Sequence, residues 1–317
     1  MTPTRQGSFR LFQIAGVEIF LHWSWFVVAL IEINQRQNSY STVTWNALEY
    51  ITLFGIVLLH EMGHALACRQ VGGQANQIVL WPLGGVAYVK PPPRPGATLW
   101  SIAAGPLVNV VLLPILLGIW FAARSAGWDA AFPDAYKFIR MIGYINFGLL
   151  VFNLLPIYPL DGGQILQSLL WFVFGRARSL QIATVIGFVG VGGLVALAVA
   201  SHSIWIGILA FFVLINCWRG WTIGRMLLRL EKAPRRSEYR CPLCQASPPI
   251  GTFWGCGKCG KPFDTFETHA TCPNCGENFG VTACVSCGRS SPIDQWVTAP
   301  PLPTSSAPPP PLPPQTV

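Results

Sequence analysis

Residues 44–68 read TWNALEYITLFGIVLLHEMGHALAC, an apolar run long enough to cross a bilayer. Near its end, His60 and His64 stand one helical turn apart, so both imidazoles leave the same face and can hold one zinc ion. Glu61 lies beside them and can take a proton from an activated water. Ionisable groups are costly in hydrocarbon, so three of them here indicate a functional site. The stretch therefore predicts a hydrolytic zinc centre inside a membrane.

The composition is that of a membrane protein. Of 317 residues, 52% are hydrophobic and only 11% are Asp, Glu, Lys or Arg, with a mean hydropathy of +0.45. Soluble domains carry about 25% charged residues. Much of the net charge of +8 follows the last apolar run directly, at Arg219, Arg225, Arg229, Lys232, Arg235 and Arg236. This is the pattern of a cytoplasmic flank beside anionic lipid, and it disfavours a nucleic-acid partner.

The apolar runs predict an all-α polytopic membrane protein. We expect about six transmembrane helices, at residues 17–34, 44–68, 98–122, 136–155, 179–200 and 203–220. Residues 71–97 instead hold short β-branched and aromatic runs broken by glycine pairs, which predict a small β-hairpin element. Basic residues fall on the cytoplasmic side of most turns if the N-terminus is inside, so both termini are expected in the cytoplasm.

Shifts in composition divide the chain into five parts. We expect a cytoplasmic lead, a membrane-embedded domain, a basic juxtamembrane linker, two tandem zinc ribbons and a disordered proline-rich tail. Their expected bounds are 1–16, 17–220, 221–240, 241–287 and 288–317.

A catalytic zinc ion usually has three protein ligands and one open position. The candidate third ligand is Asp161, in Asn153-Leu-Leu-Pro156-Ile-Tyr-Pro-Leu160-Asp161-Gly162-Gly163. The two prolines end the preceding helix, so the carboxylate can turn inward. The two glycines that follow permit a close approach. Ligation to zinc would offset the cost of an aspartate at this depth.

The His-Glu-x-x-His helix and the Leu160-Asp161-Gly162 turn, in its Asn-x-x-Pro context, together resemble the site-2 protease family of intramembrane zinc metalloproteases. The segment Gly105-Pro106-Leu107-Val108-Asn109 also looks like a family motif, and the resemblance covers about residues 15–220. It implies that the zinc ligands are His60, His64 and Asp161. It also implies that Glu61 is the catalytic base.

Two further roles follow from the same resemblance. Asn109 would face the site and donate a hydrogen bond to the tetrahedral oxyanion; alternatively, it only links helices. The glycine-rich hairpin near Gly84 and Gly85 resembles the element that receives the substrate as an extended strand. The substrate would be a membrane-spanning protein whose helix unwinds before it is cut.

Eight of the ten cysteines form four Cys-x-x-Cys pairs, a spacing typical of structural zinc. A cytosolic location favours metal thiolates over disulfides. Pairing in sequence order predicts one zinc ribbon on Cys241, Cys244, Cys256 and Cys259 and a second on Cys272, Cys275, Cys284 and Cys287. An interleaved pairing and iron in place of zinc both stay open. With the catalytic ion, three zinc ions are expected. Such a tail departs from the family pattern, in which appended domains are commonly of the PDZ or cystathionine-synthase type.

These observations predict an intramembrane zinc endopeptidase. Two alternatives stay open: a zinc transporter, in which His60, His64 and Asp161 would be a transient site, and an inactive scaffold that binds membrane segments and recruits partners through its ribbons. Glu61 discriminates among them, because neither alternative needs a general base. Membrane lipid is an expected partner, and a protein could bind the ribbons or the proline-rich tail.

Overall fold

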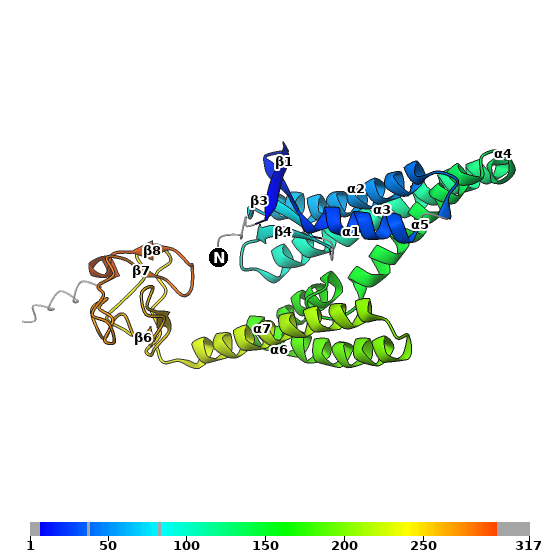
Figure 1. The fold of residues 1–317 in the computed structure, drawn as a ribbon. Coiled ribbons are helices and arrows are strands. Elements are labelled where there is room, and N and C mark those ends of the chain that lie inside the picture. Colours follow the sequence, from blue (N-terminus) through cyan, green and yellow to red (C-terminus); the bar gives the residue numbers. More distant parts are fainter. Residues whose placement is uncertain (1–6, 37–38, 82–83, 297–317) are drawn as a thin grey trace, which may run out of the picture. The chain divides into compact units, whose positions relative to one another are not determined.

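The computed structural model describes residues 7–36, 39–81 and 84–296, and the chain divides into two compact units, Met1–Leu227 and Leu228–Val317. The first unit is mostly helical (Figure 1). Its helices are α1 Ser24–Gln35, α2 Val43–Gln70, α3 Pro95–Ser125, α4 Trp128–Ala131, α5 Pro133–Leu154, α6 Asp161–Ala200 and α7 Ile204–Lys232, whose last turn belongs to the second unit. Helix α2 packs against α3, and α5 packs against both.

Five helices of the described residues are long and apolar enough to cross a membrane, namely α2, α3, α5, α6 and α7. The expected membrane fold is confirmed, but the helix predicted at 17–34 is wrong in its first half. Residues Val17–His22 form strand β2, because their β-branched and aromatic side chains find a neighbouring strand. The remaining helix, α1, has 12 residues. It rises about 18 Å, less than the ~30 Å of hydrocarbon.

The β element is a four-stranded sheet in the order β1-β2-β3-β4, larger than the predicted hairpin. Its strands are β1 Ser8–Ile14, β2 Val17–His22, β3 Gln74–Trp81 and β4 Gly84–Lys90. The pairs β1–β2 and β3–β4 are antiparallel, and β2 runs parallel to β3. The expected N-terminal lead thus contributes strand β1. Ile19, Ile78 and Leu80 pack against Ala65 and Cys68 of α2, so the sheet lies beside the zinc motif.

Helix α6 joins two segments that the sequence separates. The short apolar stretch before Gly175 and the helix predicted at 179–200 form one element, bent at Gly175 with φ 76° and ψ 168°. Only glycine adopts this conformation readily. Gly163 and Gly187 are equally far along the chain from Gly175, and both contact Tyr158. The two halves of α6 therefore fold back toward the same turn.

The second unit begins within α7. Helix α7 continues to Lys232, so the predicted linker at 221–240 is helical over its first half. Two hairpins follow, formed by β5 Trp254–Gly255 with β6 Pro262–Phe263 and by β7 Thr282–Ala283 with β8 Ser290–Ser291. Trp296, at the end of η2 Ile293–Trp296, is 1% exposed in the core of this unit. The predicted disordered tail therefore starts too early at 288. Residues 297–317, with the proline-rich run, lie outside the described residues.

Candidate metal centre

Two histidines of α2 converge on one point. His60 and His64 are each 5% exposed. His60 Nδ1 lies 2.6 Å from Asn109 Oδ1, and His64 Nδ1 lies 2.9 Å from the carbonyl oxygen of Ser101. Both partners are acceptors, so each Nδ1 carries a proton and each Nε2 presents a lone pair. The two rings have the tautomer and orientation that a metal ligand needs.

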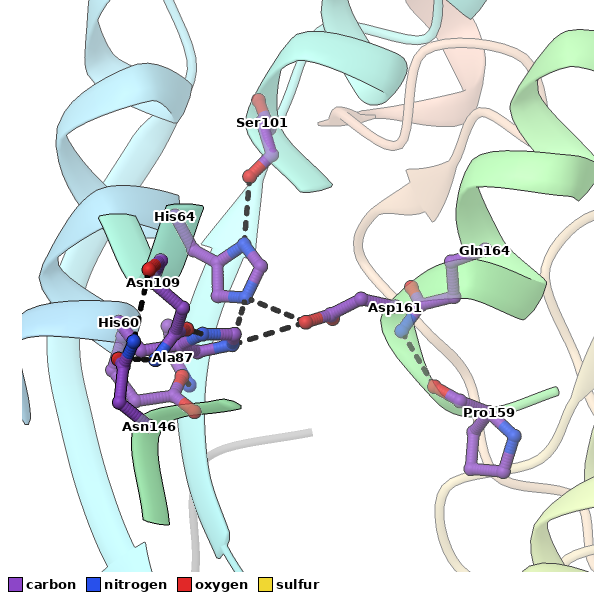
Figure 2. A network of polar contacts seen from close by, with 10 residues as sticks. His60, His64, Ala87, Ser101, Asn109, Asn146, Pro159, Asp161 and Gln164 are labelled. Carbon is purple, nitrogen blue, oxygen red and sulfur yellow. Dashed lines mark hydrogen bonds and ion pairs between the residues drawn. The ribbon is translucent and has the colours of Figure 1, made fainter. Parts of the chain in front are cut away.

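Asp161 faces these nitrogens from the first residue of α6 (Figure 2). Its Oδ2 lies 3.0 Å from His60 Nε2 and 3.4 Å from His64 Nε2, and the two Nε2 atoms are 3.2 Å apart. Zinc bonds of about 2.0–2.1 Å in a tetrahedral site place ligand atoms about 3.3 Å apart. Two lone pairs and a carboxylate at this spacing fit a divalent cation. The residues present therefore suit zinc.

The turn that carries Asp161 folds tightly on itself. Helix α5 ends at Leu154, where the sequence predicts that the prolines break it. A Cβ atom on Gly162 would lie 2.5 Å from the carbonyl oxygen of Leu155, and one on Gly163 would meet the Ile157–Tyr158 backbone. These glycines let the first turn of α6 lie against the turn before it. Asp161 consequently points from α6 back toward α2.

Two glycines let α2 and α3 approach beside the histidines. A Cβ atom on Gly105 would lie 2.9 Å from His60 Nε2, and it would also overlap the His64 ring. One on Gly63 would lie 2.6 Å from the carbonyl oxygen of Ala104. Larger residues at these positions would fill the metal centre or separate the helices. The motif that begins at Gly105 thus makes room for the imidazoles.

Glu61 lies between the metal centre and the sheet. It is 6% exposed, and its Oε2 accepts a hydrogen bond of 2.9 Å from the backbone N–H of Ala87 in β4. A Cβ atom on Gly85 would lie 2.6 Å from Glu61 Oε1, so this part of β4 needs a glycine. The contact with Ala87 fixes one carboxylate oxygen and leaves the other available for proton transfer. Gly85 of the hairpin therefore makes room for the Glu61 carboxylate.

Asn109 contacts His60 and is fully buried. Its Nδ2 donates to Asn146 Oδ1 at 2.8 Å, and Asn146 Nδ2 donates back to the carbonyl oxygen of Asn109 at 3.0 Å. The predicted oxyanion contact needs a donor aimed at the substrate, whereas this amide is aimed at Asn146. The arrangement indicates that Asn109 orients His60. Asn146 completes this network, and the sequence signal for such a polar contact is an amide on an otherwise apolar helix.

Glu49, the other buried carboxylate of α2, belongs to a separate cluster. It accepts hydrogen bonds from Arg36 and, at 2.5 Å, from the Tyr40 hydroxyl. Asn46 Nδ2 donates to the carbonyl oxygen of Arg36 at 3.1 Å. Eleven residues, about 16 Å of helix, separate Glu49 from His60. This cluster ties the end of α1 to the start of α2.

The eight paired cysteines form two four-sulfur sets, but the predicted pairing in sequence order is wrong. Each Cys-x-x-Cys pair forms a knuckle. The first and last knuckles form one set, with Cys241, Cys244, Cys284 and Cys287, and the two knuckles between them form the other, with Cys256, Cys259, Cys272 and Cys275. Within each set, sulfur atoms of different knuckles contact each other at 3.5 Å to 3.9 Å. Zinc–sulfur bonds of about 2.3 Å in a tetrahedron place sulfurs about 3.8 Å apart. The arrangement is nested, because the chain between the outer knuckles contains the whole inner set.

The thiols in these sets differ in acidity. The backbone N–H of Lys261, with help from Asn274, lowers the pKa of Cys259 to about 6. Burial and hydrogen bonding to Cys241 and Cys244 raise the pKa of Cys284 to about 12. Some thiols are thus poised as thiolates, while their neighbours resist ionisation until a cation balances the charge. This behaviour suits a metal cluster that binds together with its folding.

Comparisons with known proteins agree with this geometry. The model of peptidase family M50 matches residues 49–126 and 122–198. Zinc metalloprotease MJ0392 of Methanocaldococcus jannaschii is 36% identical over 182 residues, which are 57% of this chain and 50% of that protein. Putative zinc metalloprotease sll0528 of Synechocystis is 31% identical over 231 residues, 66% of this chain and 59% of that protein. The solved site-2 protease from Methanocaldococcus jannaschii aligns with a TM-score of 0.50 and 28% identity, over 68% of this chain and 95% of that one.

The fold and the metal centre define a class, the membrane-embedded zinc metalloproteins with a hydrolase-type ligand set. Within it, the chain belongs to the site-2 protease family, peptidase family M50. It spans between half and three-fifths of the length of the two relatives described above.

Proposed function

We propose that this protein is an intramembrane zinc endopeptidase that hydrolyses peptide bonds in or near the transmembrane segments of membrane proteins. One observation carries the proposal: His60, His64 and Asp161 present three ligand atoms to one point, with Glu61 held beside them against a strand edge. A transporter could use the three ligands but has no need of the base, and an inactive scaffold needs neither.

The residues around the centre divide the chemistry among them. Zinc bound by His60, His64 and Asp161 would activate water and polarise the scissile carbonyl. Glu61 accepts the proton of the attacking water and returns it to the leaving amine. Ala87 keeps Glu61 in place through Oε2, so the transfer uses Oε1. We assign Asn109 a positioning role, through His60, in place of the expected contact with the oxyanion.

Strand β4 would receive the substrate. It is an edge strand of the sheet, and edge strands offer backbone donors and acceptors to an added strand. The Ala87 N–H points at Glu61 and not at the neighbouring strand. The edge of β4 that does not pair with β3 therefore lies next to the proposed base. A transmembrane helix would have to unwind to pair there, which brings an extended peptide bond to the zinc ligands.

We also propose three zinc ions per chain, one catalytic and two structural, with both termini in the cytoplasm. The two four-cysteine sets support the stoichiometry, and the basic residues at the end of α7 support the orientation. We assign the ribbons a protein partner or substrate. Deleting residues 233–317 and finding every substrate processed as before would contradict that assignment.

Glu61→Gln is the decisive variant for the proteolytic function. It keeps the volume of the side chain and removes the base, so zinc binding should persist while cleavage falls by about 10²- to 10⁴-fold. Proteomics of membrane fragments in cells with the wild-type or the variant enzyme would identify uncut substrates, and metal analysis of the purified proteins would count zinc.

Glu231→Gln is the matched control, since Glu231 is exposed on α7 and should leave both measurements unchanged. Equal fragment patterns with Glu61→Gln and wild type would overturn the protease assignment. Zinc transport by vesicles that cut no membrane peptide would favour the transporter.

A further inference from the structure

The turn that carries Asp161 packs against α6 and α7. Cys217 Sγ of α7 lies 2.9 Å from the carbonyl oxygen of Tyr158, three residues before Asp161. Cys217 and Val213 are fully buried, and with Val191 of α6 they form a cluster that includes Ile157 and Tyr158. The turn therefore has a contact surface built by α6 and α7, neither of which carries the histidines.

Three glycines shape this surface closely around the turn. A Cβ atom on Gly187 would lie 3.1 Å from the carbonyl oxygen of Tyr158, and one on Gly190 would lie 2.6 Å from Ile157 Cγ1. On α7, a Cβ atom on Gly220 would lie 2.7 Å from Tyr158 Cε1. The space beside each of these glycines is too small for a methyl group. Replacing any of them with alanine would therefore displace the turn or the helix.

These contacts matter for the metal because the turn has little freedom of its own. Gly163 in the first turn of α6 also packs on the backbone of Ile157 and Tyr158, so both halves of the same bent helix contact the turn. A displacement of Tyr158 would be passed through Pro159 and Leu160 to the Asp161 carboxylate. The two histidines belong to α2 and would not follow it.

We infer that the second half of α6 and α7 form a clamp on Ile157 and Tyr158 that sets the position of Asp161 relative to the histidines. Gly187, Cys217 and Gly220 are positioning residues in this clamp. The inference rests on the proposed role of Asp161 as the third zinc ligand. It assigns α7, which contributes none of the three ligands, a part in holding the catalytic metal.

Gly220→Ala in the full-length protein tests the clamp. The added methyl group presses on Tyr158, so the affinity of the catalytic site for zinc should fall by about 10- to 100-fold, the usual loss when a group that orients a ligand is disturbed. Competition with chelators of graded strength would measure it, and Asp161→Asn would show the signature of a lost catalytic ion. The two ribbon ions should stay bound, and unchanged helical circular dichroism would show that the membrane helices are folded.

Gly207→Ala is the matched control on the same helix, because a Cβ atom there meets nothing within 4 Å. It should bind zinc like the wild type. Thr184→Ser added to Gly220→Ala should restore part of the affinity, since it removes Cγ2, the atom 2.6 Å from the added methyl group. A general packing defect would instead lower the thermal midpoint without a selective loss of the catalytic ion.

Cys217→Ala keeps the test decisive if Gly220→Ala fails to accumulate. It removes atoms and the contact with Tyr158, and it should weaken catalytic zinc binding several-fold. Wild-type affinity in a folded Gly220→Ala or in Cys217→Ala would overturn the clamp. The protease assignment is judged separately by Glu61→Gln, which leaves the zinc count at its wild-type value.

Discussion

The metal centre in the membrane and the cysteine sets at the C-terminal end are built in opposite ways. His60 and Asp161 are 101 residues apart in sequence and are brought together by packed helices. Each cysteine set draws its sulfurs from two short knuckles, and Cys241 and Cys272 are part of a core that includes Phe266 and Trp296. In the first case the fold makes the site. In the second case, bound metal would be needed to stabilise the fold.

The difference lies in what orients the ligands. The imidazoles are held by Asn109 and by the Ser101 carbonyl, which stay in place whether or not a cation is present. The thiols of each set contact one another, as in the 3.7 Å contact between Cys244 and Cys284. Without a cation these contacts are between weak donors and acceptors. The membrane centre is therefore preorganised, whereas we expect the ribbons to depend on bound ions.

Complete removal of metal should separate the two regions most strongly. Structural zinc supplies about 10–16 kcal/mol of apparent binding free energy in small zinc modules, so the ribbons should unfold without it. The membrane helices should keep their helicity and lose only cleavage activity. Limited proteolysis would detect new cuts within residues 238–296, and circular dichroism would report the helices. Ribbons that stay resistant to protease after exhaustive chelation would contradict the comparison.

Pairs of cysteine substitutions should distinguish the nested arrangement from pairing in sequence order. Cys241→Ser should lose one zinc ion. Adding Cys284→Ser should cost no further ion, because both residues serve the same set. Adding Cys256→Ser instead should lose a second ion. Metal analysis gives the counts, and the opposite pattern for the two double variants would restore the order expected from the sequence.

The sequence could indicate the proposed ligands because their signals are local. Two histidines one helical turn apart, and a carboxylate after a proline break, depend only on neighbouring residues. The pairing of the knuckles could not be predicted from such local signals. Twelve residues separate Cys259 from Cys272 and eleven separate Cys244 from Cys256, so both gaps suit a ribbon. The choice is made by packing around Trp254 and Phe266, which are distant in sequence from part of each set.

Tertiary context also decided the elements that the sequence reasoning missed. Val17–His22 is apolar enough for the start of a membrane helix, but it becomes a strand because β3 offers a parallel partner. The bend at Gly175 is not visible as a bend, since Arg176, Arg178 and Ser179 interrupt the apolar pattern and make the two halves of α6 look like separate elements. The contact between Asn109 and His60 joins two helices. Spacing along one helix gives no information about such a contact.

Asn109→Ala should show how far the membrane centre depends on preorganisation. It removes the acceptor from His60 Nδ1 and the Nδ2 donor from Asn146 Oδ1, so the catalytic site should lose about 10- to 100-fold in zinc affinity. Chelator competition would measure the loss, and the ribbon ions serve as the internal control. Asn109→Asp keeps an acceptor and should be closer to wild type. Equal affinities for the alanine variant and wild type would show that the helices alone position His60.

The smallest expected effect is that of an ion pair beside the inner cysteine set. Lys258 Nζ lies 2.9 Å from Glu277 Oε2, but the two side chains are 64% and 43% exposed. Glu277 raises the pKa of Lys258, yet solvent screens such exposed pairs, so Lys258→Ala should leave the thermal midpoint and zinc release of the ribbons unchanged. Arg236→Ala is the informative contrast, because it leaves the 2%-exposed carboxylate of Asp264 without its cation and should destabilise the ribbons by about 1–3 kcal/mol. If Lys258→Ala destabilised the ribbons as much as Arg236→Ala does, exposed ion pairs would stabilise this unit, and the comparison with metal and the buried core would be contradicted.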